Sequence, residues 1–227
     1  GTEQKNAVFY KRLDQADAEV VELLPDFDAK YTYLGNEGTL FWFRTNLDAP
    51  KGRVIAIDLD KPQRENWKEV IPESQHLLEM ASVVGDQFFL EYLKDAHSMV
   101  VMCDLEGDSI RELKLPGVGT AVGFGGHRDD TETFYAFTSF TTPPKIFRYD
   151  LKSGESSLYK EAKVDFDPNR YETKQVFYKS KDGTRVPMFI SHRKGLELNG
   201  QNPTLLYGYG GFNASLTPSF SVVNLVW

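Results

Sequence analysis

The sequence predicts a mainly β protein, a partial β-propeller of about three and a half blades followed by the start of a second domain. Two observations predict the propeller. Short alternating apolar runs separated by turn residues dominate the first 162 residues, and long helical periodicity is absent. Four of these runs also end on leucines that are 46 residues apart, at Leu13, Leu59, Leu105 and Leu151. A period of this length with several short strands per unit is typical of propeller blades.

The repeat carries a polar marker that has two possible roles. An aspartate precedes the leucine in the last three copies, at Asp58, Asp104 and Asp150, whereas Arg12 stands there in the first copy. These aspartates could be catalytic, but they recur once per unit at the exit of a strand, where aspartate commonly caps a turn. We therefore predict that they are structural.

Composition limits the partners that the protein can have. The 227 residues carry a net charge of −7 and contain no dense basic block, so we expect no nucleic-acid partner. No apolar run approaches the roughly 20 residues that a membrane helix needs, so we expect no membrane partner. Cys103 is the single cysteine, which excludes an internal disulfide and favours a reducing compartment such as the cytoplasm.

The repeat fades after residue 162, and we expect a domain boundary there, with blades in 1–162 and a second domain in 163–227. Asp182-Gly183 predicts a two-residue hairpin turn, and Pro187 indicates an edge or bulge position in the second strand. We expect the apolar runs "TLLYGYG" and "SVVNLVW" to be strands, the first of them buried. Because the first unit is incomplete and the second domain ends on an apolar run, we expect an internal piece of a longer protein.

The glycine-rich stretch "YGYGGF", which begins at Tyr207, allows several interpretations. A phosphate cradle is disfavoured, because Gly208, Gly210 and Gly211 lack the nucleotide-binding spacing and no Lys-Ser/Thr follows. A plain tight turn is one remaining interpretation. The other is the oxyanion loop that follows a strand in α/β-hydrolases, where glycine lets the backbone approach the substrate without a clash.

Long runs of the sequence resemble the prolyl oligopeptidase family. They include "NPTLLYGYGGFNASLTPSFS", the upstream hairpin "VFYKSKDGTRVPMFISHRKG", and "YTYLGNEGTLFWFRTN", "TAVGFGG" and "DTETFYAFTSFTTP" in the repeat. The resemblance covers essentially the whole chain. It implies that residues 1–162 are the C-terminal blades of a seven-bladed propeller, and that 163–227 begin an α/β-hydrolase catalytic domain. It also implies a monomeric, cofactor-free serine endopeptidase that cuts short proline-containing peptides on the carboxyl side of proline.

The resemblance also implies roles for two residues of the glycine-rich stretch. Tyr209 matches the tyrosine that donates its hydroxyl to the oxyanion, and Phe212 matches the phenylalanine that lines the proline pocket. No G-x-S-x-G stands in the 227 residues, so we expect the Ser/Asp/His triad outside this chain and no activity from the chain alone. An arginine that the family's propeller directs at the substrate has no match here. The four histidines have no metal-ligand spacing, so no metal is expected.

Two functions from different classes remain. The first is a segment of a prolyl endopeptidase, and the second is a non-catalytic propeller that binds peptides and carries a degenerate hydrolase tail. The roughly one hundred residues that follow in the gene discriminate between them. A strand followed by G-x-S-x-G there indicates the peptidase, and its absence indicates the binding module.

Overall fold

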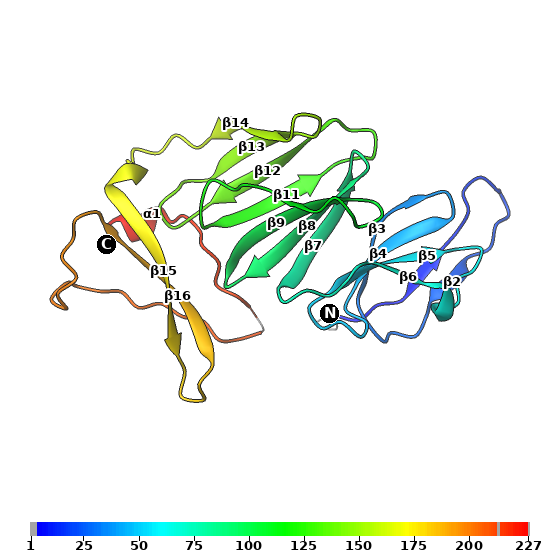
Figure 1. Cartoon of the computed structure of the whole chain (residues 1–227), viewed down its shortest axis with the longest axis horizontal. Helices are drawn as coiled ribbons and strands as arrows, with labels where there is room; N and C mark the ends of the chain where they lie inside the picture. The colour runs from blue at the N-terminus through cyan, green and yellow to red at the C-terminus, as the bar shows by residue number, and fades with distance from the viewer. Residues whose placement is uncertain (1–3, 213, 227) are drawn as a thin grey trace. The chain divides into compact units, whose positions relative to one another are not determined.

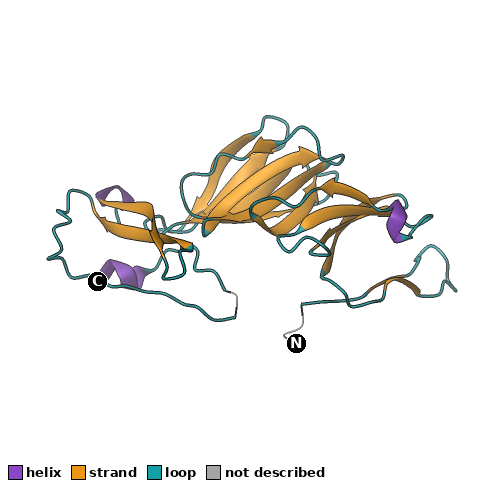
Figure 2. Cartoon of the chain, turned by 60° about the horizontal axis from the view of Figure 1, so that its bottom comes forward, coloured by secondary structure: helices purple, strands orange, loops and turns teal. Residues whose placement is uncertain are grey.

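The computed structural model describes residues 4–212 and 214–226 (Figure 1). The chain divides into two compact units. The first contains the residues up to Tyr92 together with Val100–Leu113 and Gly125–Asp130, and the second contains Leu93–Met99, Lys114–Phe124 and the residues from Thr131 onward. Nearly all regular structure in the described residues is β-strand, as Figure 2 shows, which confirms the prediction of a mainly β protein.

The described strands form three four-stranded sheets and two two-stranded pairs, and neighbouring strands in each are consecutive in the chain. The first pair is β1 (Val8–Tyr10) and β2 (Val21–Leu24). The first four-stranded sheet consists of β3 (Tyr31–Glu37), β4 (Leu40–Thr45), β5 (Arg53–Asp58) and β6 (Lys68–Ile71). The second consists of β7 (Leu77–Val84), β8 (Gln87–Lys94), β9 (His97–Asp104) and β10 (Arg111–Glu112). The third consists of β11 (Thr120–Gly125), β12 (Glu132–Thr138), β13 (Lys145–Asp150) and β14 (Glu155–Glu161).

This arrangement is the partial propeller that the repeat predicts. The pair β1–β2 corresponds to half a blade and each four-stranded sheet to a whole one. The leucines Leu59, Leu105 and Leu151 directly follow the third strands β5, β9 and β13. The 46-residue period is therefore the spacing of equivalent strands in successive blades.

The aspartates of the repeat cap the turns that follow these third strands. The Oδ1 atom of Asp58 accepts the backbone N–H of Asp60 at 3.0 Å, and Asp104 accepts that of Asp108 at 2.7 Å. Asp150 accepts the N–H of Ser153 at 2.7 Å. These backbone donors lower the pKa of Asp58 and Asp150, because they stabilise the ionised carboxylate. The predicted structural role of the aspartates is confirmed.

The core of the first unit is built from strands that are buried on both faces. In β5 the four residues from Val54 to Ile57 are all buried, as is typical of a strand with other layers on each side. Trp42 on β4 meets Phe88 on β8 edge to face, with ring centroids 5.8 Å apart. One cluster of buried side chains comprises Leu24, Ala29, Tyr31, Phe43, Leu47, Ile55 and Ile57.

In the second unit the rings of three successive strands stack in a row. Tyr135 on β12 lies between Phe124 on β11 and Phe147 on β13, with centroid distances of 4.8 and 5.2 Å and nearly parallel planes. The outermost strand, β14, is exposed along its whole length. Buried aromatic residues on the second strand of each four-stranded sheet thus lie at the centre of the packing.

A regular hairpin follows the sheets. After the short 3-10 helix η2 (Pro168–Arg170), β15 (Tyr171–Lys179) pairs in full antiparallel register with β16 (Arg185–Arg193). Pro187 lies on β16, which pairs with β15 alone, so its predicted edge position is confirmed. The turn is longer than the predicted two residues. It spans residues 180–184, because the Asp182 side chain accepts the N–H of Thr184 and Gly183, at φ +86°, donates to Ser180.

The prediction of two strands beyond the hairpin is wrong. Residues 201–221 contain no strand among those described, and Leu205 and Leu206 are exposed. The last predicted strand is instead the short helix α1 (Val222–Val226), and Trp227 lies outside the described residues. A strand needs a partner for its backbone N–H and C=O groups, and no described strand pairs with these segments. Apolar composition alone therefore did not decide their conformation. A second 3-10 helix, η1 (Arg64–Asn66), precedes β6.

Candidate functional site

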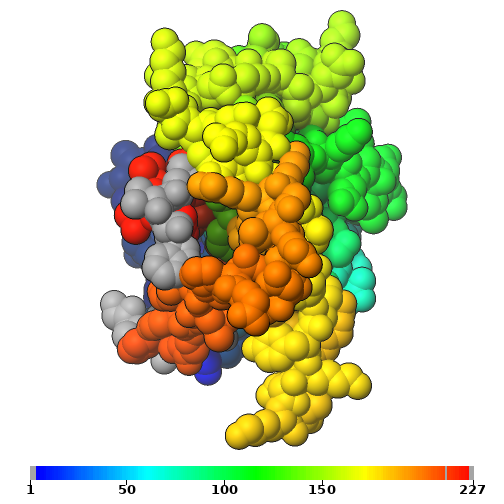
Figure 3. All heavy atoms as spheres, turned by 90° about the vertical axis from the view of Figure 1, so that its left-hand side faces the viewer, coloured from blue at the N-terminus to red at the C-terminus, as the bar shows by residue number. Residues whose placement is uncertain are grey.

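The candidate site is an irregular loop over residues 205–212 whose side chains are open to solvent. Leu206 is 82% exposed and Tyr207 is 73% exposed, although both are large and largely apolar. Figure 3 shows this part of the chain, in orange to orange-red, at the surface of the face in view. A contiguous run of exposed apolar side chains is typical of a segment that contacts another molecule or another part of a protein.

The loop is held at both ends. On the upstream side the Asn202 side chain donates to the carbonyl of Glu197 at 2.8 Å. On the downstream side Thr120 donates to the carbonyl of the buried Pro218 at 2.7 Å, and the N–H of Phe220 donates to Thr138 at 3.2 Å. Both downstream contacts tie the loop to strands of its own unit. The exposed middle of the loop thus lies between a local hydrogen bond upstream and two hydrogen bonds to strands downstream.

Tyr209 lies in the middle of this loop, and its ring folds back toward Gly211. Its side chain is half-exposed. A β-carbon built on Gly211 would lie 2.9 Å from the Tyr209 hydroxyl oxygen and 3.1 Å from Cζ. The ring therefore rests against the α-carbon of Gly211.

Phe212 follows directly and has an unusual backbone conformation. Its φ is +54°, in the left-handed region that bulky residues rarely adopt, and its side chain is 96% exposed. The N–H of Ala214 donates to the carbonyl of Gly211 at 3.1 Å, so the chain turns at Phe212. This turn projects the Phe212 ring into solvent, where it contributes nothing to the described core.

The structure thus brings Tyr209 and Phe212 onto one exposed loop. The sequence contains no G-x-S-x-G motif. His192 serves the hairpin, because its Nδ1 lies 2.9 Å from the carbonyl of Arg193 and its Nε2 lies 3.7 Å from Glu172. Within residues 4–212 and 214–226, no group of three His, Cys, Asp or Glu side chains could hold a metal ion. In the same ranges no helix is long and apolar enough to cross a membrane.

Sequence reasoning missed the contacts that hold the hairpin beside the turn after β8. Gln175 donates to the carbonyl of Asp95 at 2.5 Å, and an Arg185 Nη1 lies 3.7 Å from the Asp95 carboxylate. The Arg185 guanidinium also lies 3.3 Å above the centre of the Phe177 ring. All four residues belong to the second unit. Asp95 lies 80 and 90 positions from Gln175 and Arg185, so no local signal indicates its contacts with them.

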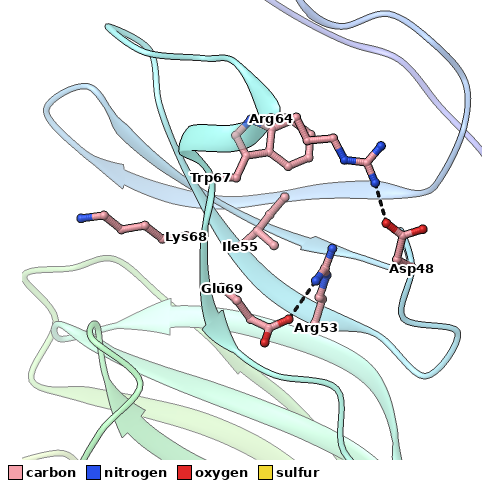
Figure 4. Close-up of a pocket in the computed structure, with 7 residues that line it drawn as sticks. All are labelled: Asp48, Arg53, Ile55, Arg64, Trp67, Lys68 and Glu69. Atoms are coloured by element: carbon pink, nitrogen blue, oxygen red, sulfur yellow. Dashed lines mark hydrogen bonds and ion pairs between the residues drawn. The ribbon is translucent and has the colours of Figure 1, made fainter.

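A hollow of about 190 Å³ lies elsewhere, in the first unit, and was also missed (Figure 4). Arg53 pairs with Glu69 at 2.8 Å and Arg64 pairs with Asp48 at 2.5 Å, so the charges around it largely compensate one another. The hollow is lined by Asp48, Arg53, Ile55, Arg64, Trp67, Lys68 and Glu69. It contains neither of the predicted site residues.

Comparisons with known proteins agree across the whole chain. A family model described as prolyl oligopeptidase, N-terminal beta-propeller domain, matches residues 1–162. The prolyl endopeptidase of Elizabethkingia meningoseptica is 42% identical over 222 residues, which cover 98% of this chain and 31% of that protein. The prolyl endopeptidase of Dictyostelium discoideum is 37% identical over 221 residues, which cover 91% of this chain and 29% of that protein.

Solved structures give the same result. A structure from an analysis of two prolyl endopeptidases and of inter-domain dynamics in catalysis and specificity superposes with a TM-score of 0.89 at 42% identity. It matches 99% of this chain and 33% of that one. Prolyl oligopeptidase B from Galerina marginata, bound to a 35mer hydrolysis and macrocyclization substrate, superposes with a TM-score of 0.86 at 31% identity. That match covers 97% of this chain and 32% of the other. The chain therefore spans about a third of the length of the proteins it matches.

Proposed function

Because this chain belongs to the prolyl oligopeptidase family, we propose that it is a segment of a serine endopeptidase that cuts short peptides on the carboxyl side of proline. The observation that carries the proposal is the 42% identity to a prolyl endopeptidase over 98% of the chain. Identity of this extent reaches past the propeller match, which ends at residue 162, into the hairpin and the loop of Tyr209. Residues 163–227 would then begin an α/β-hydrolase domain.

Tyr209 is the residue of this chain that we assign to the reaction. When a serine attacks a peptide carbonyl, the carbonyl oxygen gains negative charge, and a donor placed for that oxygen lowers the barrier. The Tyr209 hydroxyl is suited to this role, because its ring is supported by Gly211 and its side chain is half-exposed. Its proton stays on the tyrosine, which acts by hydrogen bonding alone.

Phe212 is assigned to substrate selection. Proline carries a compact, uncharged ring, and an aromatic side chain offers a flat apolar wall against which such a ring packs. The exposed Phe212 ring is available for this contact, because it is not used in the core of this chain. Tyr209 and Phe212 would therefore act on neighbouring parts of one substrate, the carbonyl of the scissile bond and the proline before it.

The remaining groups would come from outside this chain. We propose that the nucleophilic serine, its histidine base and the aspartate belong to other segments of the same protein, since no G-x-S-x-G is present here. The proposed reaction is covalent serine catalysis, which needs no cofactor. Cys103 is buried, and burial raises the pKa of its thiol to about 12, so it would stay an unreactive thiol in a reducing cytoplasm. We propose that the enzyme is monomeric.

The experiment compares the intact protein, its Tyr209→Phe variant and the isolated 227-residue chain on a chromogenic Gly-Pro substrate. We expect the intact protein to be active and blocked by a serine-directed phosphonate, and the isolated chain to be inactive. Tyr209→Phe keeps the ring and removes the hydroxyl, so kcat should fall on the order of 10²–10³-fold with little change in KM or melting temperature. An intact protein that binds proline peptides without cleaving them would instead be the propeller binding module.

A further inference from the structure

The three glycines around Tyr209 differ in what surrounds them. A β-carbon added at Gly208 or at Gly210 meets no described atom within 4 Å. A β-carbon added at Gly211 would lie 2.9, 3.1 and 3.5 Å from Oη, Cζ and Cε1 of Tyr209. The two shorter distances are below the roughly 3.5–4.0 Å at which non-bonded atoms pack favourably. None of the three glycines has a left-handed φ, so backbone conformation does not require glycine at any of them.

We propose that Gly211 is a positioning residue for Tyr209, because the missing side chain provides the surface on which the tyrosine ring rests and which sets the direction of its hydroxyl. The proposal rests on the proposed function, in which the Tyr209 hydroxyl stabilises the oxyanion. The proposal gives a specific reason why glycine stands at position 211. Among the described residues, Gly208 and Gly210 have open space beside them.

A side chain that fills this space would displace the Tyr209 side chain and leave the fold unchanged. The atoms closest to the added carbon are at the far end of the Tyr209 ring, and that side chain is half-exposed. Rotation about its χ angles moves the hydroxyl away without disturbing a packed core. Alanine at position 211 should therefore leave stability unchanged while it displaces the donor.

Displacement of the donor has a large effect on the reaction. A donor stabilises an oxyanion when it lies about 2.7–3.1 Å from the developing charge. A misplacement of about 1 Å can cost on the order of 10²-fold in rate. Substrate binding through the proline side would be retained, because Phe212 is a separate contact. The effect should consequently appear in kcat and leave KM nearly constant.

The test uses the intact enzyme and four variants: Gly211→Ala, the matched controls Gly208→Ala and Gly210→Ala, and Tyr209→Phe. We expect Gly211→Ala to lower kcat on an amide substrate by about 10- to 100-fold, with KM and melting temperature unchanged, and to lower it more than either control does. A peptide aldehyde ending in proline, whose adduct places an oxygen at the oxyanion position, should bind Gly211→Ala more weakly by a similar factor.

A fifth variant, which combines Gly211→Ala with Tyr209→Phe, separates this proposal from the proposed function. If Gly211 acts through Tyr209, Gly211→Ala should have no further effect once Tyr209 is phenylalanine. A large loss from Tyr209→Phe together with parental kinetics for Gly211→Ala overturns the positioning role and leaves the oxyanion role standing. Parental kinetics for Tyr209→Phe overturn the oxyanion role itself. Equal losses from all three alanine variants would mean that general loop flexibility matters, which also overturns the positioning role.

Discussion

The guanidinium of Arg128 lies against the carboxylate of Asp86, with both Nε and Nη2 2.6 Å from Oδ1. Arg128 is in the loop between β11 and β12, and Asp86 is in the turn between β7 and β8. The third nitrogen of the Arg128 guanidinium, Nη1, donates to the carbonyl of Asn36 at 3.1 Å, close to the turn between β3 and β4. One side chain of the first unit therefore joins equivalent turns of three successive blades.

Replacement of Arg128 should loosen this connection between blades. Arg128→Ala removes the ion pair, the bond to Asn36 and the contact of the guanidinium with the Trp42 ring at 5.6 Å. Because the side chain is about one third exposed, we expect a loss of only about 1–2 kcal/mol in the free energy of unfolding. Urea unfolding of the purified protein measures this change in the free energy of unfolding. Arg12→Ala, whose partner Asp14 is exposed and two residues away, should leave the midpoint unchanged; equal effects of the two variants would contradict the prediction.

Two glycines in equivalent turns should differ in their tolerance of alanine. Gly107 and Gly154 both follow a third strand and both have a left-handed φ, +89° and +72°. A β-carbon at Gly107 would lie 2.2 Å from the backbone oxygen of Val70, whereas at Gly154 it meets only the Tyr149 hydroxyl at 3.6 Å. Gly154→Ala should cost about 1–2 kcal/mol through backbone strain, and Gly107→Ala about 3–5 kcal/mol because the backbone must also move. Chemical unfolding compares them, and similar costs would refute the steric argument.

Glu91 should make stability fall as the pH rises. It is a buried residue on β8, and burial, with a smaller contribution from the charge of Glu79, raises its pKa to about 7. An unfolded glutamate ionises near pH 4.3. Between these two pH values the unfolded chain releases a proton that the folded protein keeps. The contribution of Glu91 to the free energy of unfolding is therefore fully present below about pH 4 and is lost as the pH rises through 7.

Glu91→Gln removes this ionisation and tests its contribution. We expect the variant to be more stable than the parent at pH 8, by on the order of 3 kcal/mol, and nearly equal to it at pH 4.5. Urea midpoints at the two pH values give the comparison. Glu112→Gln, at an exposed position on β10 of the same sheet, is the control and should change little at either pH. A Glu91→Gln variant whose advantage is the same at both pH values would show that the effect is not one of ionisation.

Phe212 should influence which substrate is cut and not whether the enzyme folds. Its ring is 96% exposed, so Phe212→Ala should leave the melting temperature unchanged. In the intact enzyme we expect KM for proline substrates to rise and the preference over alanine substrates to narrow, because the alanine side chain gains less from an aromatic wall. Steady-state kinetics on matched proline and alanine peptides measure both. Equal losses on the two substrates would indicate that Phe212 supports the loop instead.

The sequence by itself determined the strand repeat, because that repeat depends on local signals. The spacing of Leu59, Leu105 and Leu151 follows from alternating apolar residues and from turns that an aspartate caps, and each turn is closed by a bond between residues two to four positions apart. The same holds for the edge position of Pro187. Resemblance to the family identified Tyr209 and Phe212, whose roles remain proposals.

The tertiary structure decided everything that depends on partners distant in the chain. Leu205 and Leu206 have the composition of a buried strand but are exposed, because a strand forms only where another strand pairs with it. The turn at Asp95 receives Gln175 from 80 positions away, and Glu91 is buried by neighbours that no local pattern indicates. Gly208, Gly210 and Gly211 are identical in the sequence. Only the folded position of the Tyr209 ring distinguishes Gly211, where an added β-carbon would lie 2.9 Å from the Tyr209 hydroxyl oxygen.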